Sequence, residues 1–420
     1  MSETRFNEKH FLRVLAGIHF SHIVDFMIIM PLGPAIMRDF DVGASSFGLL
    51  ISAYTYSGAI SALLIALLVD RFSRRQIFLL VFASFIFSTM ACACAQSYEQ
   101  MLVARTMTGA FGGVLGALIH TLSGDFIPYE RRGKASGLIL SAFSIASILG
   151  VPVSLSLTEI LGWRSPFILI GCVGLSLLIF ALRVIPSSTN NSLSKEITSK
   201  NRLSPQVKPD KPGGAIYAIL EPLWVVFHLK SSAKAIGLSV SVLFASFLFI
   251  PYITLHLIET VKIEPSRIPL VYLLGGGATF VTSRLIGYLT DRYGKLETFR
   301  IVTLASIIPL AILPNLGPSS LLTTLSVTTV FFIFVSGRMV PLSATLVSIT
   351  QPEFRGRFMS INSALQQVAM GTAAWVGGAI IQSNYDGNTK ISILAVSISL
   401  FAIIWSRLIR LYDTTQLNSK

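Results

Sequence analysis

Residues 19–34, HFSHIVDFMIIMPLGP, place two histidines and an aspartate in an otherwise apolar stretch. Asp25 is the only acidic residue well inside any apolar stretch of this chain. A carboxyl group is costly in hydrocarbon, so such residues usually face a helix-bundle interior or a water-filled cavity and mark ion or proton pathways. His22 precedes Asp25 by three residues and shares its helical face, and His19 lies a turn further toward the N-terminus. The three side chains could form a proton relay. The alternative is that Asp25 only hydrogen-bonds a neighbouring helix.

Of the arginines inside apolar stretches, two are candidates for a role in transport, Arg105 in ARTMTGAFGG and Arg338 in VSGRMVPLSA. A buried guanidinium needs an acceptor for its donors. For Arg105 that acceptor would be Asp25 or backbone carbonyls. The helix rise puts Arg105 about 9 Å nearer the outer face than Asp25, so a direct pair is not assured. For Arg338 the acceptor would be an anionic or hydroxyl-rich substrate, Asp25 or the backbone.

Further polar side chains occur in the apolar stretches of the second half of the chain. Uncharged amides, hydroxyls and rings suit sugars, nucleosides or polar drugs, although each is equally compatible with a hydrogen bond between helices. The candidate substrate-binding residues are Arg338, Tyr252, His256, Asn362, Gln366 and Gln367. Nothing in the spacing of the cysteines indicates a metal site. No metal and no cofactor are expected.

The composition indicates the elements that position these residues. The chain has 420 residues, of which 52% are hydrophobic and 13% charged, outside the range of ordinary soluble domains. About twelve apolar stretches are long enough to cross a ~30 Å hydrocarbon core as helices. We therefore predict an all-α membrane protein. The predicted spans are about 12–36, 46–69, 76–96, 100–122, 135–158, 165–185, 235–258, 267–290, 299–316, 320–345, 357–382 and 391–411.

The net charge of +13 is distributed unevenly between the predicted loops. Most Lys and Arg residues lie in loops on the side of the N-terminus. The basic residues of the opposite loops are Arg38, Arg164, Lys262, Arg267 and Lys390. This bias is typical of membrane topology and predicts that both termini are cytoplasmic. It does not resemble a nucleic-acid-binding surface.

A polar segment separates two sets of six predicted helices. Residues 187–213 are rich in Ser, Asn, Lys and Pro and cannot bury enough apolar surface to order themselves. Residues 215–230 regain an amphipathic pattern and are predicted to lie along the membrane surface. The predicted organisation is an N-terminal six-helix bundle (1–186), a cytoplasmic linker with the amphipathic segment (187–234) and a C-terminal six-helix bundle (235–420).

The two halves also repeat each other in sequence. ALLVDRFSRR at 66–75 corresponds to GYLTDRYGKL at 287–296, and RRGKAS at 131–136 corresponds to FRGRFMS at 354–360. Pro31 corresponds to Pro251. All three correspondences are separated by about 220 residues, which indicates a duplication. Secondary transporters are often built from such repeats, with a substrate site at the midplane between the halves.

Several segments resemble the major facilitator superfamily. They are LVDRFSRR with LTDRYGK, the helical run ARTMTGAFGG, the loop PYERRGKASG and the segment ILGVPVSLSLTEILGWRSPF. The likeness is strongest to the arabinose-efflux-like branch of the bacterial drug:proton antiporters. This resemblance implies twelve helices in two pseudo-symmetric bundles, alternating access and a place in the bacterial inner membrane. It also implies that Arg105 takes part in proton coupling.

The repeated loop motifs are expected to form a cytoplasmic gate through ion pairs between the halves and interactions with helix ends. Such contacts hold one of two states closed and break in the other. The predicted gate residues are Asp70, Arg71, Arg74, Arg75, Arg284, Asp291, Arg292 and Lys295. Gly150 and Pro152 interrupt the fifth predicted helix, and Pro251 and Pro341 interrupt the seventh and the tenth, as hinges or as static bends.

These observations predict a secondary active transporter that exports a small polar or amphipathic compound in exchange for protons. It is expected to be a monomer in the lipid bilayer, to bind no nucleic acid and not to be an enzyme. No Gly-rich phosphate-binding loop is present, so ATP-driven transport by this chain alone is not expected. A proton symporter or uniporter that imports its substrate is an alternative, because direction is not encoded in any residue visible here. More distant alternatives are an intramembrane enzyme with His22 and Asp25 as an acid-base pair, and a transporter-like receptor.

Overall fold

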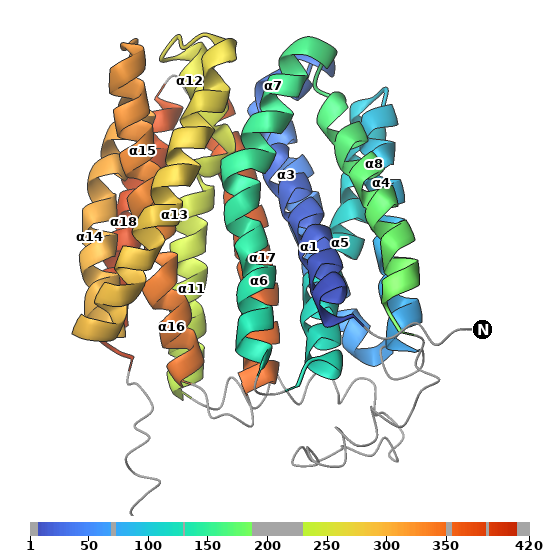
Figure 1. Ribbon diagram of the computed structural model, residues 1–420. Coiled ribbons are helices and arrows are strands. Elements are labelled where there is room, and N and C mark those ends of the chain that lie inside the picture. Colours follow the sequence, from blue (N-terminus) through green and yellow to red (C-terminus); the bar gives the residue numbers. More distant parts are fainter. Residues whose placement is uncertain are drawn as a thin grey trace, which may run out of the picture. The chain divides into compact units, whose positions relative to one another are not determined.

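The computed structural model describes residues 7–68, 73–128, 131–186, 230–349, 355–383 and 386–409, and every element in these ranges is helical (Figure 1). Within them, 12 helical segments are long and apolar enough to cross a membrane, as predicted. The chain divides into two compact units. The first unit is Met1–Ile29 with Ala53–Gly214, and the second unit is Met30–Ser52 with Ala215–Lys420. The predicted linker and amphipathic segment, up to residue 229, lie outside the described residues.

Side-chain caps start several helices of the first unit. Asn7 accepts from the backbone N–H groups of Lys9 and His10, and Ser97 does the same for Gln100. Such caps satisfy donors that the first helical turn leaves open. The helices are α1 (Glu8–Ile28), α3 (Ala44–Leu68, which crosses into this unit at Ala53), α4 (Arg74–Cys94), α5 (Tyr98–Phe126), α6 (Arg132–Ile145), a π-helical segment (Ala146–Gly150), α7 (Val151–Leu161) and α8 (Ser165–Val184).

Two kinds of packing hold the first unit together. In the core, α1 packs on α5, α6 and α8, and α4 packs on α5 and α8, around buried side chains such as Phe82 and Leu115. Between α3 and α5 the backbones themselves meet. A Cβ atom added at Gly109 would lie 2.1 Å from the Tyr54 carbonyl oxygen. Small residues permit such close approach between membrane helices.

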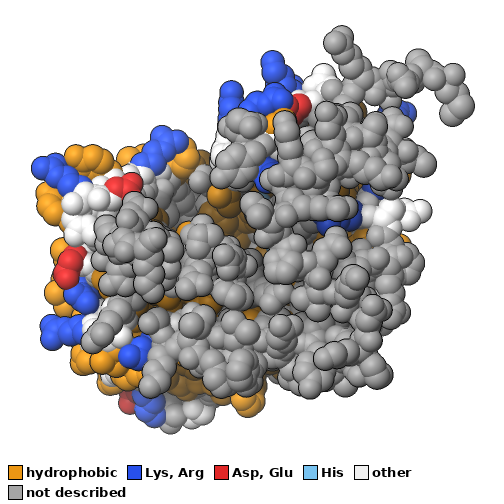
Figure 2. Space-filling view, turned by 90° about the horizontal axis from the view of Figure 1, so that it is seen from below, with side chains coloured by type: hydrophobic (Ala, Val, Ile, Leu, Met, Phe, Trp, Pro, Cys, Tyr) orange, Lys and Arg blue, Asp and Glu red, His pale blue; other side chains and the backbone are white. Residues whose placement is uncertain are grey.

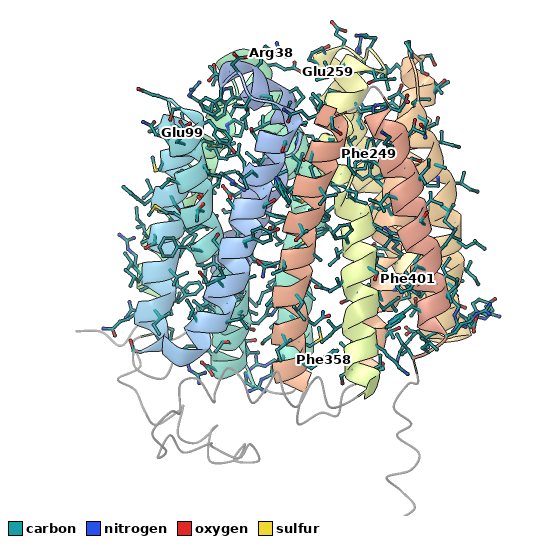
Figure 3. All side chains as sticks on the ribbon, turned by 180° about the vertical axis from the view of Figure 1, so that it is seen from behind. Arg38, Glu99, Phe249, Glu259, Phe358 and Phe401 are labelled. Atoms are coloured by element: carbon teal, nitrogen blue, oxygen red, sulfur yellow. The ribbon has the colours of Figure 1, made fainter. Side chains whose placement is uncertain are left out.

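The second unit contains the remaining helices. The element α11 packs on α17 and α18, α13 packs on α15, and α14 packs on α15, α16 and α18. Figure 3 shows Glu259 at one end of the helices of this unit and Phe358 near the other. The helices are α2 (Gly33–Asp39), α11 (Lys230–Phe247), α12 (Ile253–Glu259), α13 (Ile268–Tyr293), α14 (Lys295–Ile312), α15 (Leu321–Gly337), α16 (Met339–Ile349), α17 (Arg355–Ser383) and α18 (Gly387–Ser406).

Prolines lie at several interruptions of the membrane-crossing segments. A short 3-10 turn containing Pro251 separates α11 from α12, and Pro31 lies in the turn between α1 and α2. Pro341 lies near the start of α16 and has no N–H to bond the carbonyl of Gly337. The chain therefore breaks at Arg338, which stands between α15 and α16. The segment Ala146–Gly150 is π-helical, so the predicted interruption near Pro152 is present as well.

Basic side chains gather at the end of the helices where α1 begins. In Figure 2, which views this end, Lys and Arg are more frequent than Asp and Glu among the described residues. The distribution agrees with the charge bias of the loops. The orientation in a membrane stays a prediction.

Candidate functional site

Asp25 and Arg105 form a buried ion pair in the first unit. Nη1 of Arg105, on α5, donates to Oδ2 of Asp25, on α1, over 3.1 Å, and both side chains have no exposed area. The other carboxylate oxygen accepts a hydrogen bond from Oγ1 of Thr89, on α4, at 3.3 Å. The sequence left this pairing open because of the axial offset between the two positions. The long arginine side chain covers that offset.

An aromatic ring completes the surroundings of Arg105. Its guanidinium carbon lies 4.4 Å from the ring centroid of Tyr54, on α3, in a cation–π contact. Among the described residues, neither Nε nor Nη2 of Arg105 has a hydrogen-bond partner, and the Tyr54 hydroxyl has none either. The ion pair is therefore enclosed by protein while Arg105 keeps donors for another partner.

Three histidines lie in a row beside this pair. The rings of His19 and His22 stack with centroids 6.1 Å apart, and His120 of α5 meets His19 edge-on at the same distance of 6.1 Å. Sequence reasoning missed His120 because it is far from Asp25 along the chain. The signal that points to it is the spacing of Gly112, Gly116 and His120, which places them on one face of α5.

Arg338 is fully buried in the second unit and has no carboxylate partner among the described residues. Its Nη1 donates to hydroxyls of Ser399 at 3.0 Å and Ser306 at 3.4 Å. Its Nη2 donates to Oγ of Ser246 at 2.8 Å and to the carbonyl of Val242 at 3.2 Å. Its Nε has no partner among the described residues. Of the acceptors predicted for Arg338, a backbone carbonyl is the one observed among the described residues. Three serine hydroxyls accept its other hydrogen bonds.

Three other candidate substrate residues make hydrogen bonds between helices. The Tyr252 hydroxyl donates to the carbonyl of Ala374 in α17. The Nδ1 atom of His256 lies 3.0 Å from the side-chain amide of Asn388. Asn362 accepts from Ser239 of α11 at 2.6 Å.

In these bonds the three residues join helices to each other, which is the alternative to substrate binding that the sequence left open. Among the described residues, no hydrogen bond joins Tyr252, His256 or Asn362 to Arg338. Gln366 and Gln367 are partly buried on α17. The structure therefore does not gather the six candidates into one hydrogen-bonded cluster.

The gate residues of the first unit have local partners. Nη1 of Arg74 forms an ion pair with Asp125, near the end of α5, at 2.6 Å. Nη2 of Arg75 donates to the carbonyl of Leu182 over 2.7 Å. Asp70 and Arg71 lie outside the described residues. Sequence reasoning missed Asp125 because it does not belong to the repeated motif.

The gate residues of the second unit also make local contacts. Arg284 lies with its guanidinium carbon 4.2 Å from the ring centroid of Phe280 in its own helix. Arg292 donates to the Tyr288 hydroxyl over 3.2 Å. Lys295 donates to the hydroxyl of Ser348. Asp291 is exposed and takes part in none of the ion pairs within the described ranges.

The π-helical segment lies against the helix that carries Asp25. A Cβ atom at Gly150 would lie 2.5 Å from Cγ2 of Val24, so a larger side chain would displace α1. An apolar cavity of about 170 Å³ opens beside it, between α1, α7 and α8. Its lining is almost entirely aliphatic and aromatic, which does not suit a polar substrate.

The twelve membrane-crossing helices, the interruptions at prolines and the buried ion pair define a multi-pass membrane protein of the transporter type. The sequence profile of the Major Facilitator Superfamily matches residues 15–332 and 235–419. The chain belongs to this superfamily, and it is a transporter and not an enzyme. The arabinose-efflux-like branch stays a prediction.

Individual relatives agree with this assignment. The chain is 24% identical over 383 residues to the uncharacterized MFS-type transporter YwfA of Bacillus subtilis, covering 90% of this chain and 87% of the relative. It is 22% identical to a probable sugar efflux transporter of Mannheimia succiniciproducens, covering 88% of this chain and 86% of the relative. Among solved structures, the D-xylose-proton symporter matches with a TM-score of 0.75 at 16% identity, covering 96% of this chain and 97% of the other. That last likeness supports the fold.

Proposed function

We propose that this transporter exports small polar compounds in exchange for protons, with sugars as the first class to test. The observation that carries the proposal is the Asp25–Arg105 pair, which lies fully buried in apolar helices. Ionisable residues in such places are costly and commonly belong to proton or ion pathways. The efflux direction and the sugar class are suggested by the name of the relative in Mannheimia succiniciproducens.

The pair offers a simple coupling step. An ionised Asp25 holds Nη1 of Arg105, and protonation of the carboxylate removes the charge that attracts the guanidinium. Arg105 would then turn its donors to other acceptors, and the contacts among α1, α4 and α5 would change. A change of this kind favours one of two conformations, which alternating access requires. If the substrate binds better to one conformation, proton and substrate binding become linked.

We further propose that the substrate is bound in part by Arg338, whose positive charge has no carboxylate partner in its unit among the described residues. Tyr252, His256, Asn362, Gln366 and Gln367 remain candidate substrate contacts in another conformation. Asp70, Arg71, Arg74, Arg75, Arg284, Asp291, Arg292 and Lys295 remain candidate gate residues, and Gly150 with Pro152 a candidate hinge. The protein would act as a monomer in a bacterial inner membrane, with both termini in the cytoplasm.

The substitution Asp25→Asn tests the coupling. In proteoliposomes loaded with a panel of radiolabelled pentoses, hexoses and disaccharides, a pH gradient should drive movement of at least one sugar by the native protein. Asp25→Asn should abolish this movement and leave exchange of labelled for unlabelled sugar intact, because exchange needs no net proton transfer. The matched control is Asp41→Asn, at an exposed loop position with φ 51°, which asparagine tolerates.

Unchanged pH-driven movement in Asp25→Asn would remove Asp25 from the coupling step. The sign of the gradient that concentrates the sugar separates antiport from symport, and so tests the import alternative in the same vesicles.

A further inference from the structure

We infer that Asp25 exchanges protons with the cytoplasmic end of this transporter through Tyr54, His22, His19 and His120. The inference rests on the proposed proton coupling and adds the route between Asp25 and the cytoplasmic end, along which protons leave during export. The four side chains come from three helices of the first unit, α1, α3 and α5. A proton relay needs each member next to the following one, so the positions of these four side chains relative to Asp25 decide whether the route is complete.

The order runs from an exposed to a fully buried group. His120 is exposed near the end of α5, His19 and His22 are partly buried on α1, and Asp25 is completely buried. The ring centroids of His120 and His19 are 6.1 Å apart, and those of His19 and His22 are also 6.1 Å apart. At that spacing, a ring rotation or one bridging water molecule completes each transfer.

Glycines on α5 make room for this row. A Cβ atom at Gly116 would lie 4.0 Å from Cε1 of His19. A Cβ atom at Gly112 would lie 3.0 Å from Cδ2 of His22 and 2.6 Å from the Tyr54 hydroxyl oxygen. The imidazole of His22 and the hydroxyl of Tyr54 therefore meet over the same glycine. Since the Tyr54 ring also lies against Arg105, the row ends beside the ion pair.

The row has unused hydrogen-bonding capacity. Among the described residues, Nδ1 of His19, Nδ1 of His22 and the Tyr54 hydroxyl have no hydrogen-bond partner. A neutral imidazole accepts a proton on one nitrogen and releases another from its second nitrogen, so each ring returns to neutrality after passing a proton on. At the end an O–H bond forms on the Asp25 carboxylate as the last donor loses its proton to it.

An aromatic ring of α4 also contacts the row. The helix α4 presents the uncharged ring of Phe85 to His22, with centroids 5.9 Å apart. The charged groups at the inner end are Asp25 and Arg105 themselves. Among the described residues, no cluster of three His, Cys, Asp or Glu side chains is suited to a metal ion. Proton transfer is therefore the chemistry that these three imidazoles can supply.

The experiment measures how fast Asp25 gains a proton, and it needs no substrate. The full-length protein in lipid vesicles is exposed to a rapid acid jump from a caged proton, and the carbonyl stretch of the protonated carboxyl group is followed by infrared absorption. Asp25→Asn identifies the band. His120→Gln should slow its appearance by roughly a hundredfold. The final amplitude should be unchanged, and added imidazole buffer should restore the rate.

A histidine on the same helix as His19 provides the control. His10 is exposed near the start of α1, outside the row, and His10→Gln should leave the rate unchanged. As a second variant, His19→Phe keeps a planar ring without a transferable proton and should slow the band to the same extent. An unchanged rate in both His120→Gln and His19→Phe would overturn the route while leaving the coupling role of Asp25 intact. A native protein without any titrating Asp25 band would overturn the proposed function and the route together.

Discussion

The Asp25–Arg105 pair is better suited to switching than to stabilising the fold. Taking two charges out of water costs several kcal/mol per ion, and their attraction offsets this only with good geometry and full hydrogen bonding. Here the carboxylate has two donors, at 3.1 Å and 3.3 Å, while two nitrogens of Arg105 have no partner among the described residues. A pair with this balance is expected to open when one partner loses its charge.

A double-mutant cycle measures this balance. Arg105→Met should lower the free energy of unfolding by about 3–5 kcal/mol, because Asp25 is left as an uncompensated buried charge. Adding Asp25→Asn to Arg105→Met should recover most of that loss. Denaturant unfolding of the purified protein in detergent, followed by tryptophan fluorescence, gives the three differences. Strictly additive losses would mean that the two side chains do not depend on each other.

Arg338 presents the opposite case, a buried charge whose partners are neutral. Replacing buried ionic groups by apolar side chains of similar volume is often neutral or stabilising when no partner charge is left behind. Arg338→Met should therefore leave the melting temperature nearly unchanged while weakening sugar binding, measured by equilibrium dialysis with the sugar that the vesicles transport. A sharp loss of melting temperature with unaltered binding would instead make Arg338 a structural tie between α11, α14 and α18. Ser343→Ala, on the neighbouring helix α16, is the control.

Residue types and spacing were enough to single out Asp25, His22, Arg105 and Arg338 from the sequence. They were not enough to find Thr89 or the other side chains that these residues contact. Those contacts depend on which faces of distant helices pack together, and a single sequence does not specify that. The pairing of Asp25 with Arg105 was left open for the same reason.

At the scale of helices, the glycines of α5 decide how closely α3 approaches. Added Cβ atoms would lie 2.1 Å from the backbone oxygen of Tyr54 at Gly109 and 2.4 Å from Cα of Gly58 at Gly113. Backbone atoms cannot move aside as a flexible side chain can. At Gly124 of the same helix, nothing lies within 4 Å.

The effect of an alanine substitution in α5 on the melting temperature should therefore depend on which glycine is replaced. Gly109→Ala and Gly113→Ala should separate α3 from α5 and lower the melting temperature by several degrees. Gly124→Ala should leave it unchanged or raise it, because alanine favours the helix over glycine by about 1 kcal/mol. Thermal unfolding of the three variants in one detergent checks the pattern. Equal effects at all three positions would contradict the close approach of α3.

Most helix boundaries could be predicted from hydropathy and turn residues. The predicted span 165–185 corresponds to Ser165–Val184, and the interruption at Pro251 appears between α11 and α12. The first span was predicted as one helix to residue 36, whereas α1 ends at Ile28 and a separate α2 begins at Gly33. Apolar residues continue through that turn, so hydropathy alone does not reveal it. Hydropathy also does not reveal the π-helical form of Ala146–Gly150, a segment whose Gly150 packs against α1.

For the whole molecule, the superfamily is established, and the described residues contain twelve helical segments long and apolar enough to cross a membrane. The proposed function adds a proton gradient as the driving force. A coupled transporter must work in both directions. If protons drive a sugar, a sugar gradient must drive protons, because binding linkage is reciprocal. This requirement holds whichever way the protein is inserted in a vesicle, and it separates antiport, symport and uncoupled transport.

The measurement that tests this account most directly is the internal pH of proteoliposomes after a sugar is added outside. A pH-sensitive dye is trapped in the lumen and the membrane potential is clamped with potassium and valinomycin. Sugar entry through the native protein should make the lumen more alkaline as protons leave, and Asp25→Asn should show sugar exchange without this change. Acidification of the lumen would identify a symporter, and sugar entry with no change of internal pH would contradict proton coupling altogether.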